Sequence, residues 1–257
     1  MSLKIIFLLP EKNHFLQMVV WKAISIAWAS YRSGMIDDLP DKRTKDDSSL
    51  IAQVKKVALE YIQLHSYAGH DQTHTLRVYE LCKVIGEKEN ADPLILESAA
   101  LLHDVGRSFE GVDHAEKSAE LAEELLGECN FPANRIPEVQ YAIRMHRFSR
   151  GAEPNTLEAK ILQDADRIDG SGAIGVAMTF AYGGSKNTEL YDKDDPLAKN
   201  RNLDDTKYVL DHFQTKLFKL PETMHTGTAR KLIRERSTYL RSFFDQFLRE
   251  ISVETEL

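Results

Sequence analysis

The chain has 257 residues, of which 42% are hydrophobic and 28% charged, so it can bury a core of domain size and is not a disordered chain. Its two cysteines, Cys82 and Cys129, exclude a disulfide scaffold, a zinc knuckle and a dithiol redox centre, and favour a reducing, cytoplasmic compartment. The formal net charge of −7 gives no general electrostatic reason to bind nucleic acid or a membrane surface.

The first 35 residues are rich in apolar side chains, but polar residues interrupt them. The run from Pro10 to His14 breaks the segment, and Lys22 splits the second apolar stretch. A membrane-spanning helix or a signal peptide needs an unbroken apolar run, so we expect neither. Residues 37–49 are polar around Pro40, which is typical of a linker. We therefore expect an N-terminal extension and linker over residues 1–48 and one folded domain over residues 49–257.

From Leu50 onward apolar residues recur with a helical period, and no alternating run is long enough to indicate a sheet. The sequence therefore predicts an all-α domain. The expected helices cover residues 50–62, 73–85, 94–105, 113–126, 137–146, 156–168, 206–220 and 228–251. Asp71 or Thr73 could cap the second of them. The third is apolar almost all round and should lie at the centre. The five glycines between Gly170 and Gly184 predict a flexible crossing.

Two ionisable residues, His103 and Asp104, end the central apolar helix. Neighbouring side chains on a helix diverge by about 100°, so this pair can converge only on something that lies against the helix flank. A metal ion meets that need and also neutralises two groups that would be costly to bury alone. With His74 and Asp166 the set has two imidazoles and two carboxylates, which suits Mn²⁺, Fe²⁺, Co²⁺ or Mg²⁺ and lacks the thiolates of structural zinc.

Each of these residues also has an ordinary structural interpretation. A histidine such as His74, near the start of a helix, is more often a surface or capping group than a ligand. The acidic run from Asp164 to Asp169 could be a solvated helix end. The pair His103 and Asp104 is harder to explain in this way, because leucines and a valine surround it.

Three segments together carry a family resemblance: His74, then Leu101 to Arg107, then Ala165 to Ile168. They resemble the H…HD…D signature of the HD-domain superfamily of metal-dependent phosphohydrolases. The similarity extends from about Gly69 to the C-terminus and is to the small stand-alone HD hydrolases, some of which act on nucleoside triphosphates. The first fifty residues match nothing in that family.

The resemblance implies an all-helical HD-domain bundle with a divalent metal held by His74, His103, Asp104 and Asp166. Manganese is the expected ion, with magnesium, cobalt, nickel or iron as alternatives. Two further histidines lie where relatives with two metals hold the second ion, whereas in single-metal relatives they face the substrate phosphate. We favour the second role for His114 and His146, because the similarity is to single-metal enzymes and histidine can protonate a leaving group.

Arginines near the signature are candidate phosphate ligands: Arg77, Arg107 and Arg167. Arg107 is the strongest of them, because the turn at Gly106 aims it near the metal and a guanidinium can hold two phosphate oxygens. A second basic group could hold a polyphosphate tail: Arg144, Arg147 and Arg150. Every one of these residues could instead form a surface ion pair, the commoner fate of arginine.

The sequence therefore predicts a hydrolase for a small phosphorylated molecule, with a nucleotide as the expected substrate and a nucleoside triphosphate pyrophosphohydrolase as its most specific form. A water activated by the metal would attack the phosphorus, with Asp104 orienting it and His114 or His146 protonating the leaving oxygen. Two alternatives stay open, a di-iron oxygenase on the same fold and a catalytically silent ligand-binding module. The sequence leaves the exact substrate, the number of metals and the oligomeric state open.

Overall fold

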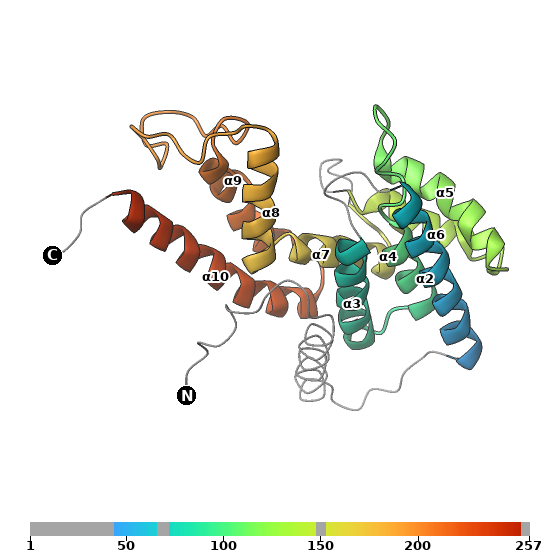
Figure 1. Ribbon diagram of the computed structural model, residues 1–257. Helices are drawn as coiled ribbons and strands as arrows, with labels where there is room; N and C mark the ends of the chain where they lie inside the picture. The colour runs from blue at the N-terminus through green and yellow to red at the C-terminus, as the bar shows by residue number, and fades with distance from the viewer. Residues whose placement is uncertain (1–43, 66–71, 148–152, 253–257) are drawn as a thin grey trace, which may run out of the picture. The chain divides into compact units, whose positions relative to one another are not determined.

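The computed structural model describes residues 44–65, 72–147 and 153–252, all within one compact unit, Asp41–Leu257 (Figure 1). The apolar extension, Gly69 to Asp71 and Arg150 all lie outside the described residues, so the expectations about them stay predictions. Within them the chain is helical, as expected, and contains no strand. No described helix has both the length and the apolar character needed to cross a membrane.

The helices occur in this order: α2 (Lys45–His65), α3 (Gln72–Glu89), α4 (Pro93–Leu102), α5 (His114–Glu128), α6 (Ile136–Met145), α7 (Leu157–Asp169), α8 (Gly172–Ser185), α9 (Val209–Thr215), the 3₁₀-helix η2 (Leu217–Thr223) and α10 (Gly227–Ile251).

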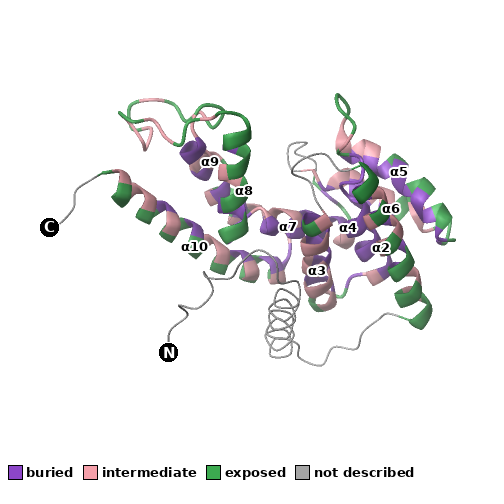
Figure 2. Cartoon of the chain, viewed as in Figure 1, coloured by how far each residue is buried: buried purple, intermediate pink, exposed green. Residues whose placement is uncertain are grey.

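Helix α4 is the centre of the bundle, as its apolar sequence predicted. Every residue from Leu94 to Leu102 is buried, and α2, α3, α6 and α7 pack around it (Figure 2). Its first turn is fixed locally, because Asp92 accepts a hydrogen bond from the backbone N–H of Ile95 and Pro93 supplies the first helical residue. The core therefore directs the C-terminal end of α4, where His103 and Asp104 follow, into the middle of the domain.

Helices α2, α3 and α4 have boundaries that differ from those expected. Helix α2 begins at Lys45, inside the segment expected to be a linker, because Thr44 and Asp47 exchange side-chain hydrogen bonds with each other's backbone N–H. Helix α3 already contains Thr73, which is therefore not its cap. Helix α4 stops at Leu102 rather than at residue 105, because the N–H of Val105 bonds to the carbonyl of Leu102 and tightens the chain into a turn.

The expected flexible crossing between Gly170 and Gly184 is wrong, because this segment forms helix α8. Glycine is needed here for close packing. A Cβ on Gly175 would lie 2.4 Å from the carbonyl oxygen of Gly170, and one on Gly183 would lie 2.3 Å from Val209 Cγ2. The side chains between these glycines are mostly apolar, so the helix forms despite the low helix propensity of glycine.

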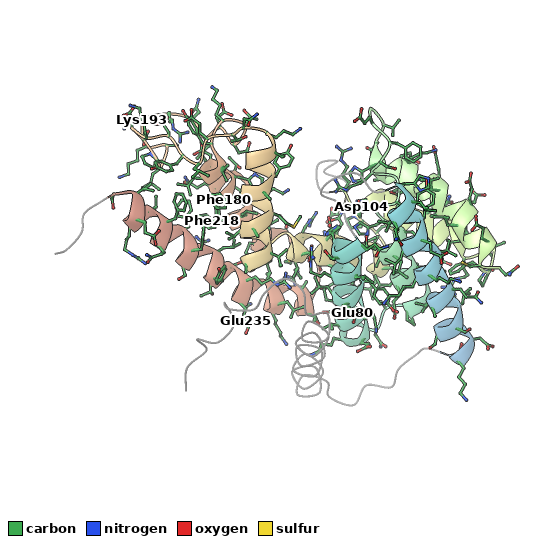
Figure 3. All side chains as sticks on the ribbon, in the orientation of Figure 1. Glu80, Asp104, Phe180, Lys193, Phe218 and Glu235 are labelled. Carbon is green, nitrogen blue, oxygen red and sulfur yellow. The ribbon has the colours of Figure 1, made fainter. Side chains whose placement is uncertain are left out.

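The single helix expected over residues 206–220 is two elements, α9 and η2. Lys216 interrupts the helical backbone with φ −131° and ψ −60°, and Pro221 lies inside η2. Helix α10 starts at Gly227, because Thr226 accepts a hydrogen bond from the N–H of Ala229. Helices α8, α9 and α10 close around aromatic rings that include Phe180 and Phe218 (Figure 3).

Candidate metal centre

The turn after α4 carries His103 and Asp104 into the centre of the bundle. His103 is fully buried, and its Nδ1 donates a hydrogen bond to the carbonyl of Ala100 at 2.8 Å, so Nε2 is left with its lone pair. The turn is docked on α5, because Gly106 N donates to Ser118 Oγ at 2.9 Å. A Cβ on Gly106 would lie 2.5 Å from the backbone nitrogen of Ser118, so only glycine fits at this contact.

Helices α3 and α7 add His74 and Asp166 to the same place. His74 Nε2 lies 3.3 Å from His103 Nε2, 3.5 Å from Asp104 Oδ2 and 3.5 Å from Asp166 Oδ1. The other ring nitrogen of His74, Nδ1, donates to Asp169 Oδ2 at 2.8 Å. The structure therefore brings His74, His103 and Asp104 into one group that could hold an ion, and Asp166 of α7 contacts this group through His74; the set of four as metal ligands stays a prediction.

The chemistry of this cluster fits a cation. Because Nδ1 of both His74 and His103 faces an acceptor, the two Nε2 atoms point towards each other and towards the oxygens of Asp104. Such a group of nitrogen and carboxylate atoms needs a positive charge among them, which a proton on His74 or a bound metal ion can supply. Two imidazole nitrogens and two carboxylates suit a divalent ion such as Mn²⁺, Fe²⁺, Co²⁺ or Mg²⁺.

The pKa shifts agree with a demand for positive charge. Burial opposes protonation of His74, but its contacts with Asp104 and Asp169 outweigh burial and raise the pKa of His74 to about 10. Burial lowers the pKa of His103 to about 4, although Asp104 acts in the opposite direction. Burial also opposes ionisation of Asp104, yet the surrounding histidines hold the pKa of this carboxyl well below its usual range. The cluster therefore keeps Asp104 ionised.

The second oxygen of Asp104 faces a different pair of histidines. Asp104 Oδ1 lies 3.7 Å from His114 Nε2, in the first turn of α5, and 3.6 Å from His146 Nε2, at the end of α6. His146 Nδ1 donates to the carbonyl of Ile143 at 2.6 Å. These three facing atoms are buried, and none has a hydrogen-bond partner within the described part of the chain. Asp104 therefore belongs to two groups that could hold an ion, one with His74 and His103 and one with His114 and His146.

The two histidines of this second group differ in their electrostatics. Burial and the charge of Arg107 lower the pKa of His114 to about 4. Burial acts in the same direction on His146, but Asp104 outweighs it and raises the pKa of His146. Of the two imidazoles that face this carboxylate oxygen, His146 therefore binds a second proton more readily than His114 does.

The candidate phosphate ligands have separate positions. Arg107 lies at the centre, where its Nε donates to Asp104 Oδ2 at 2.6 Å while one third of its side chain is exposed. Arg77 binds both oxygens of Asp169, at 2.7 and 3.0 Å. Arg167 donates to the carbonyl of Thr223 and to Gln163 Oε1. As a substrate ligand each stays a prediction; Arg107 contacts the candidate metal ligand Asp104 directly through its guanidinium.

Arg144 and Arg147 pair with acidic residues at the start of α5, Glu116 in its first turn and Asp113 at its N-cap. Arg144 binds Glu116 at 2.7 Å, and Arg147 binds Asp113 at 2.9 Å. These ion pairs agree with the ordinary structural interpretation of Arg144 and Arg147 as partners in ion pairs. They also join α6 to α5 next to His114 and His146.

Sequence reasoning missed Asp169, which is buried and binds both His74 and Arg77. The available signal was its spacing, because Asp169 follows Asp166 by one helical turn and so lies on the same face of α7.

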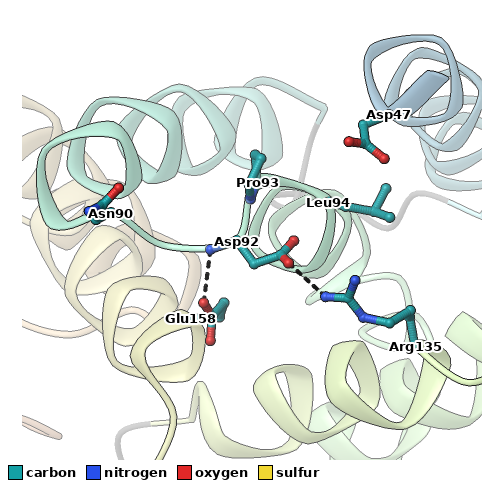
Figure 4. A pocket seen from close by; sticks show the side chains of 7 residues that line it. All are labelled: Asp47, Asn90, Asp92, Pro93, Leu94, Arg135 and Glu158. Atoms are coloured by element: carbon teal, nitrogen blue, oxygen red, sulfur yellow. Dashed lines mark hydrogen bonds and ion pairs between the residues drawn. The ribbon is translucent and has the colours of Figure 1, made fainter. Parts of the chain in front are cut away.

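A hollow of about 490 Å³ lies at the opposite end of α4 (Figure 4). Asp92 and Arg135 form an ion pair of 2.7 Å at its edge. None of the candidate site residues lines it, so it gives no support to a site there.

Comparison with known proteins places these features in a family. A model of the HD domain matches residues 72–171, the span that runs from α3 through α7. The uncharacterised protein YpgQ of Bacillus subtilis is 36% identical over 190 residues, which cover 72% of this chain and 85% of YpgQ. The crystal structure of YpgQ in complex with ADP superposes with a TM-score of 0.64 and 30% identity, over 79% of this chain and 96% of YpgQ.

A second solved structure leads to the same family. An HD-superfamily hydrolase from Bacillus thuringiensis matches with a TM-score of 0.66 and 30% identity, over 81% of this chain and its own full length. The all-helical fold, the match to the family model and the similarity over almost the whole length of these structures point to the same family as the cluster of histidines and aspartates. This chain therefore belongs to the HD-domain superfamily of hydrolases.

Proposed function

We propose that this protein is a metal-dependent phosphohydrolase that cleaves a phosphate ester or anhydride of a nucleotide. The observation that carries the proposal is the convergence of His74, His103 and Asp104, whose facing atoms lie 3.3–3.7 Å apart, with Asp166 Oδ1 3.5 Å from His74 Nε2. The Nδ1 atoms of both histidines are bonded to the protein, so Nε2 is the atom that each can offer to an ion.

The chain's own residues supply the remaining functions. A divalent ion bound there would lower the pKa of a coordinated water towards neutrality and polarise a phosphoryl oxygen. We assign Asp104 to orient the attacking water, and His114 or His146 to give a proton from Nε2 to the leaving oxygen. Arg107 would offset the charge that develops on the phosphoryl oxygens, because its guanidinium can donate two parallel hydrogen bonds.

A nucleotide is the substrate that the comparison favours. The B. subtilis relative was crystallised with ADP, and the likeness to it extends over most of both chains. The specific form that we propose is attack of water on the α-phosphorus of a nucleoside triphosphate. That reaction breaks the bond to the bridging oxygen between the α- and β-phosphorus and yields a monophosphate and pyrophosphate.

A product screen tests this proposal. The metal-free protein is loaded with Mn²⁺, Mg²⁺, Co²⁺ or Ni²⁺ and offered nucleotides and simple phosphoesters, and the products are resolved by phosphorus NMR. We expect hydrolysis that requires the metal. Asp104→Ala and Asp166→Ala should lose both bound metal and hydrolysis while they keep the helical circular dichroism.

Asp194→Ala is the matched control, because this carboxylate lies on the loop before α9 with 82% of its side chain exposed. It should retain full activity. Full activity of either site variant after one metal is restored would show that the ligand set is wrong, and a metal-loaded wild type that hydrolyses no phosphate compound would refute the reaction.

A second candidate function is an oxygenase that uses two iron ions. The observation that favours it is the second group of buried facing atoms, Asp104 Oδ1 with His114 and His146. Loading with iron in air and recording the near-ultraviolet and visible spectrum separates the candidates, because a ferric pair absorbs there and Mn²⁺ or Mg²⁺ does not. Two irons per chain, with such absorption and no phosphatase activity, would replace our proposal.

A further inference from the structure

We infer that Asp169 and Arg77 are positioning residues of the candidate metal centre: Asp169 fixes the ring of His74, and Arg77 fixes Asp169. The inference rests on the proposed function, since it assumes that His74 is a metal ligand. By this inference Arg77 holds a side chain that orients a metal ligand and does not bind the substrate. The inference also gives a role to Asp169, a carboxylate outside the H…HD…D pattern.

The contact between Asp169 and His74 determines which nitrogen of the ring is available. Asp169 has 1% of its side chain exposed, and its Oδ2 accepts a hydrogen bond from His74 Nδ1 at 2.8 Å. A proton held on Nδ1 leaves the lone pair on Nε2, the atom that lies 3.5 Å from both Asp104 and Asp166. Carboxylates often orient metal-binding histidines in this way.

Arg77 holds Asp169 by a two-point contact. Its Nε donates to Asp169 Oδ1 at 2.7 Å, and its NH2 group donates to Oδ2 at 3.0 Å. A third donor, NH1, reaches Thr73 Oγ1 at 3.0 Å and ties the guanidinium to its own helix. The planar guanidinium therefore sets the plane of the carboxylate as well as neutralising it, which a lysine ammonium cannot do.

The spacing of these residues places their side chains in two pairs, one turn apart along α3 and α7. His74 and Arg77 are three residues apart on α3, and Asp166 and Asp169 are three residues apart on α7, so each pair lies on one face of its helix. Helices α3 and α7 pack against each other. His74 contacts Asp166 at 3.5 Å, and one turn further along both helices Arg77 contacts Asp169. The hydrogen bond between Asp169 and His74 links the two pairs, so a shift of Asp169 would change the position of the His74 ring.

This part of α7 is also held from the C-terminal side. Arg236, on α10, donates a hydrogen bond to the carbonyl of Ile168, directly before Asp169. The backbone under Asp169 is thus anchored independently of His74, so the carboxylate can act as a fixed reference for the imidazole.

The experiment measures Mn²⁺ binding to the full chain by calorimetry, after chelation and without substrate. Asp169→Asn keeps the size of the side chain but removes its charge and allows the ring of His74 to exchange protons between its nitrogens. We expect Mn²⁺ affinity to fall by roughly 10–100-fold, the usual effect of losing an outer partner of a ligand. Arg77→Lys should weaken binding less, and His74→Ala should abolish it at this site.

A second readout separates positioning from a general structural role. In the protein loaded with diamagnetic Mg²⁺, where an ion takes the place of the proton on Nε2, nitrogen-15 NMR of the histidine rings reports which nitrogen of each ring carries a proton, and His74→Ala identifies the signal of His74. We expect wild-type His74 to carry its proton on Nδ1 and Asp169→Asn to show a mixture. The control is Asp92→Asn with Arg135→Lys, a similar ion pair at the other end of α4, which should change neither readout.

The outcomes distinguish this inference from the proposed function. If His74→Ala loses Mn²⁺ but Asp169→Asn and Arg77→Lys keep wild-type affinity and tautomer, Asp169 and Arg77 have no positioning role and the metal site stands. If His74→Ala keeps its Mn²⁺, the metal site itself is wrong. If Arg77→Lys changes KM for a phosphate compound but not Mn²⁺ affinity, Arg77 is a substrate ligand as the sequence first suggested.

Discussion

Asp104 is the residue that both groups of candidate metal ligands share. Its Oδ2 faces His74, His103 and Arg107, and its Oδ1 faces His114 and His146. Four imidazoles and a guanidinium around one buried carboxylate would be a costly arrangement for packing alone, because each polar group loses its hydration. Chemistry that uses both oxygens explains why these polar groups are gathered on one side chain.

Arg107→Lys tests the proposed role of the guanidinium. Lysine keeps the positive charge but cannot donate two parallel hydrogen bonds, so we expect turnover to fall by roughly 10–100-fold with Mn²⁺ content unchanged. Steady-state kinetics and elemental analysis measure the two quantities. Arg135→Lys, the same change on the far side of α4, is the control and should have wild-type kinetics. Unchanged kinetics in Arg107→Lys would make Arg107 a surface ion-pair residue.

His146→Ala distinguishes one metal from two. If His146 serves the substrate, the variant should keep about one metal per chain, and turnover should fall by roughly 10²–10⁴-fold, the usual effect of losing a general acid or base. Elemental analysis of wild type and variant decides the matter. His212→Ala is a control, since this histidine lies on α9 and binds Asp205 there instead of Asp104. A wild type with two metals, reduced to one by the substitution, would refute the single-metal mechanism and support the oxygenase.

The residues of the site were predictable to different degrees. His103 and Asp104 stand out because ionisable side chains follow an apolar helix, and His74 and Asp166 followed from the family pattern. The structure brings His74, His103 and Asp104 together, and Asp166 contacts His74. The partners of Arg77 and Arg167 were not predictable, because a local sequence does not show which distant group, Asp169 or the carbonyl of Thr223, a guanidinium will face.

At the scale of elements, the turn after α4 depends on one glycine. Gly106→Ala should lower stability by about 1–3 kcal/mol, since the new Cβ would meet backbone atoms of α5 that cannot move aside. It should also reduce hydrolysis, because Gly106 lies between Asp104 and the start of α5 at His114. Thermal unfolding and kinetics measure both effects.

Gly127→Ala is the control for this change, because a Cβ there meets nothing within 4 Å and alanine favours a helix. It should be neutral or slightly stabilising. Equal stability of the two variants would show that the contact between the turn and α5 is not tight.

The helices were predictable where apolar residues recur with a clear helical period. The prediction failed where contacts between distant parts of the chain determine whether a segment is helical. Helix α4 is central because almost all of its residues are apolar. Helix α8 was missed because its glycines suggest a loop, whereas they serve close approach to Gly170 and Val209. The break between α9 and η2 depends on the non-helical backbone angles at Lys216, which no local sequence pattern predicts.

At the scale of the whole molecule, the candidate site joins elements that are far apart in the sequence. Its ligands come from α3, the turn after α4, and α7, and the second pair of histidines comes from α5 and α6. Negative charge from Asp104 and Asp166 is concentrated where these helices meet. An ion bound there would act as a cross-link between helices, so metal affinity should contribute to the stability of the fold.

Thermal unfolding with and without metal tests this link. An ion that binds the folded chain and not the unfolded one at 100 times its Kd adds about 2.7 kcal/mol to the free energy of unfolding. For a domain of this size each kcal/mol raises Tm by about 2–4 °C. We therefore expect Mn²⁺ to raise Tm by roughly 5–11 °C over the chelated protein at equal ionic strength. Asp166→Ala should lose this shift, because it lacks a ligand, whereas Asp194→Ala should keep it. An equal Tm for the wild type with and without Mn²⁺ would mean that no ion holds α3, α4 and α7 together.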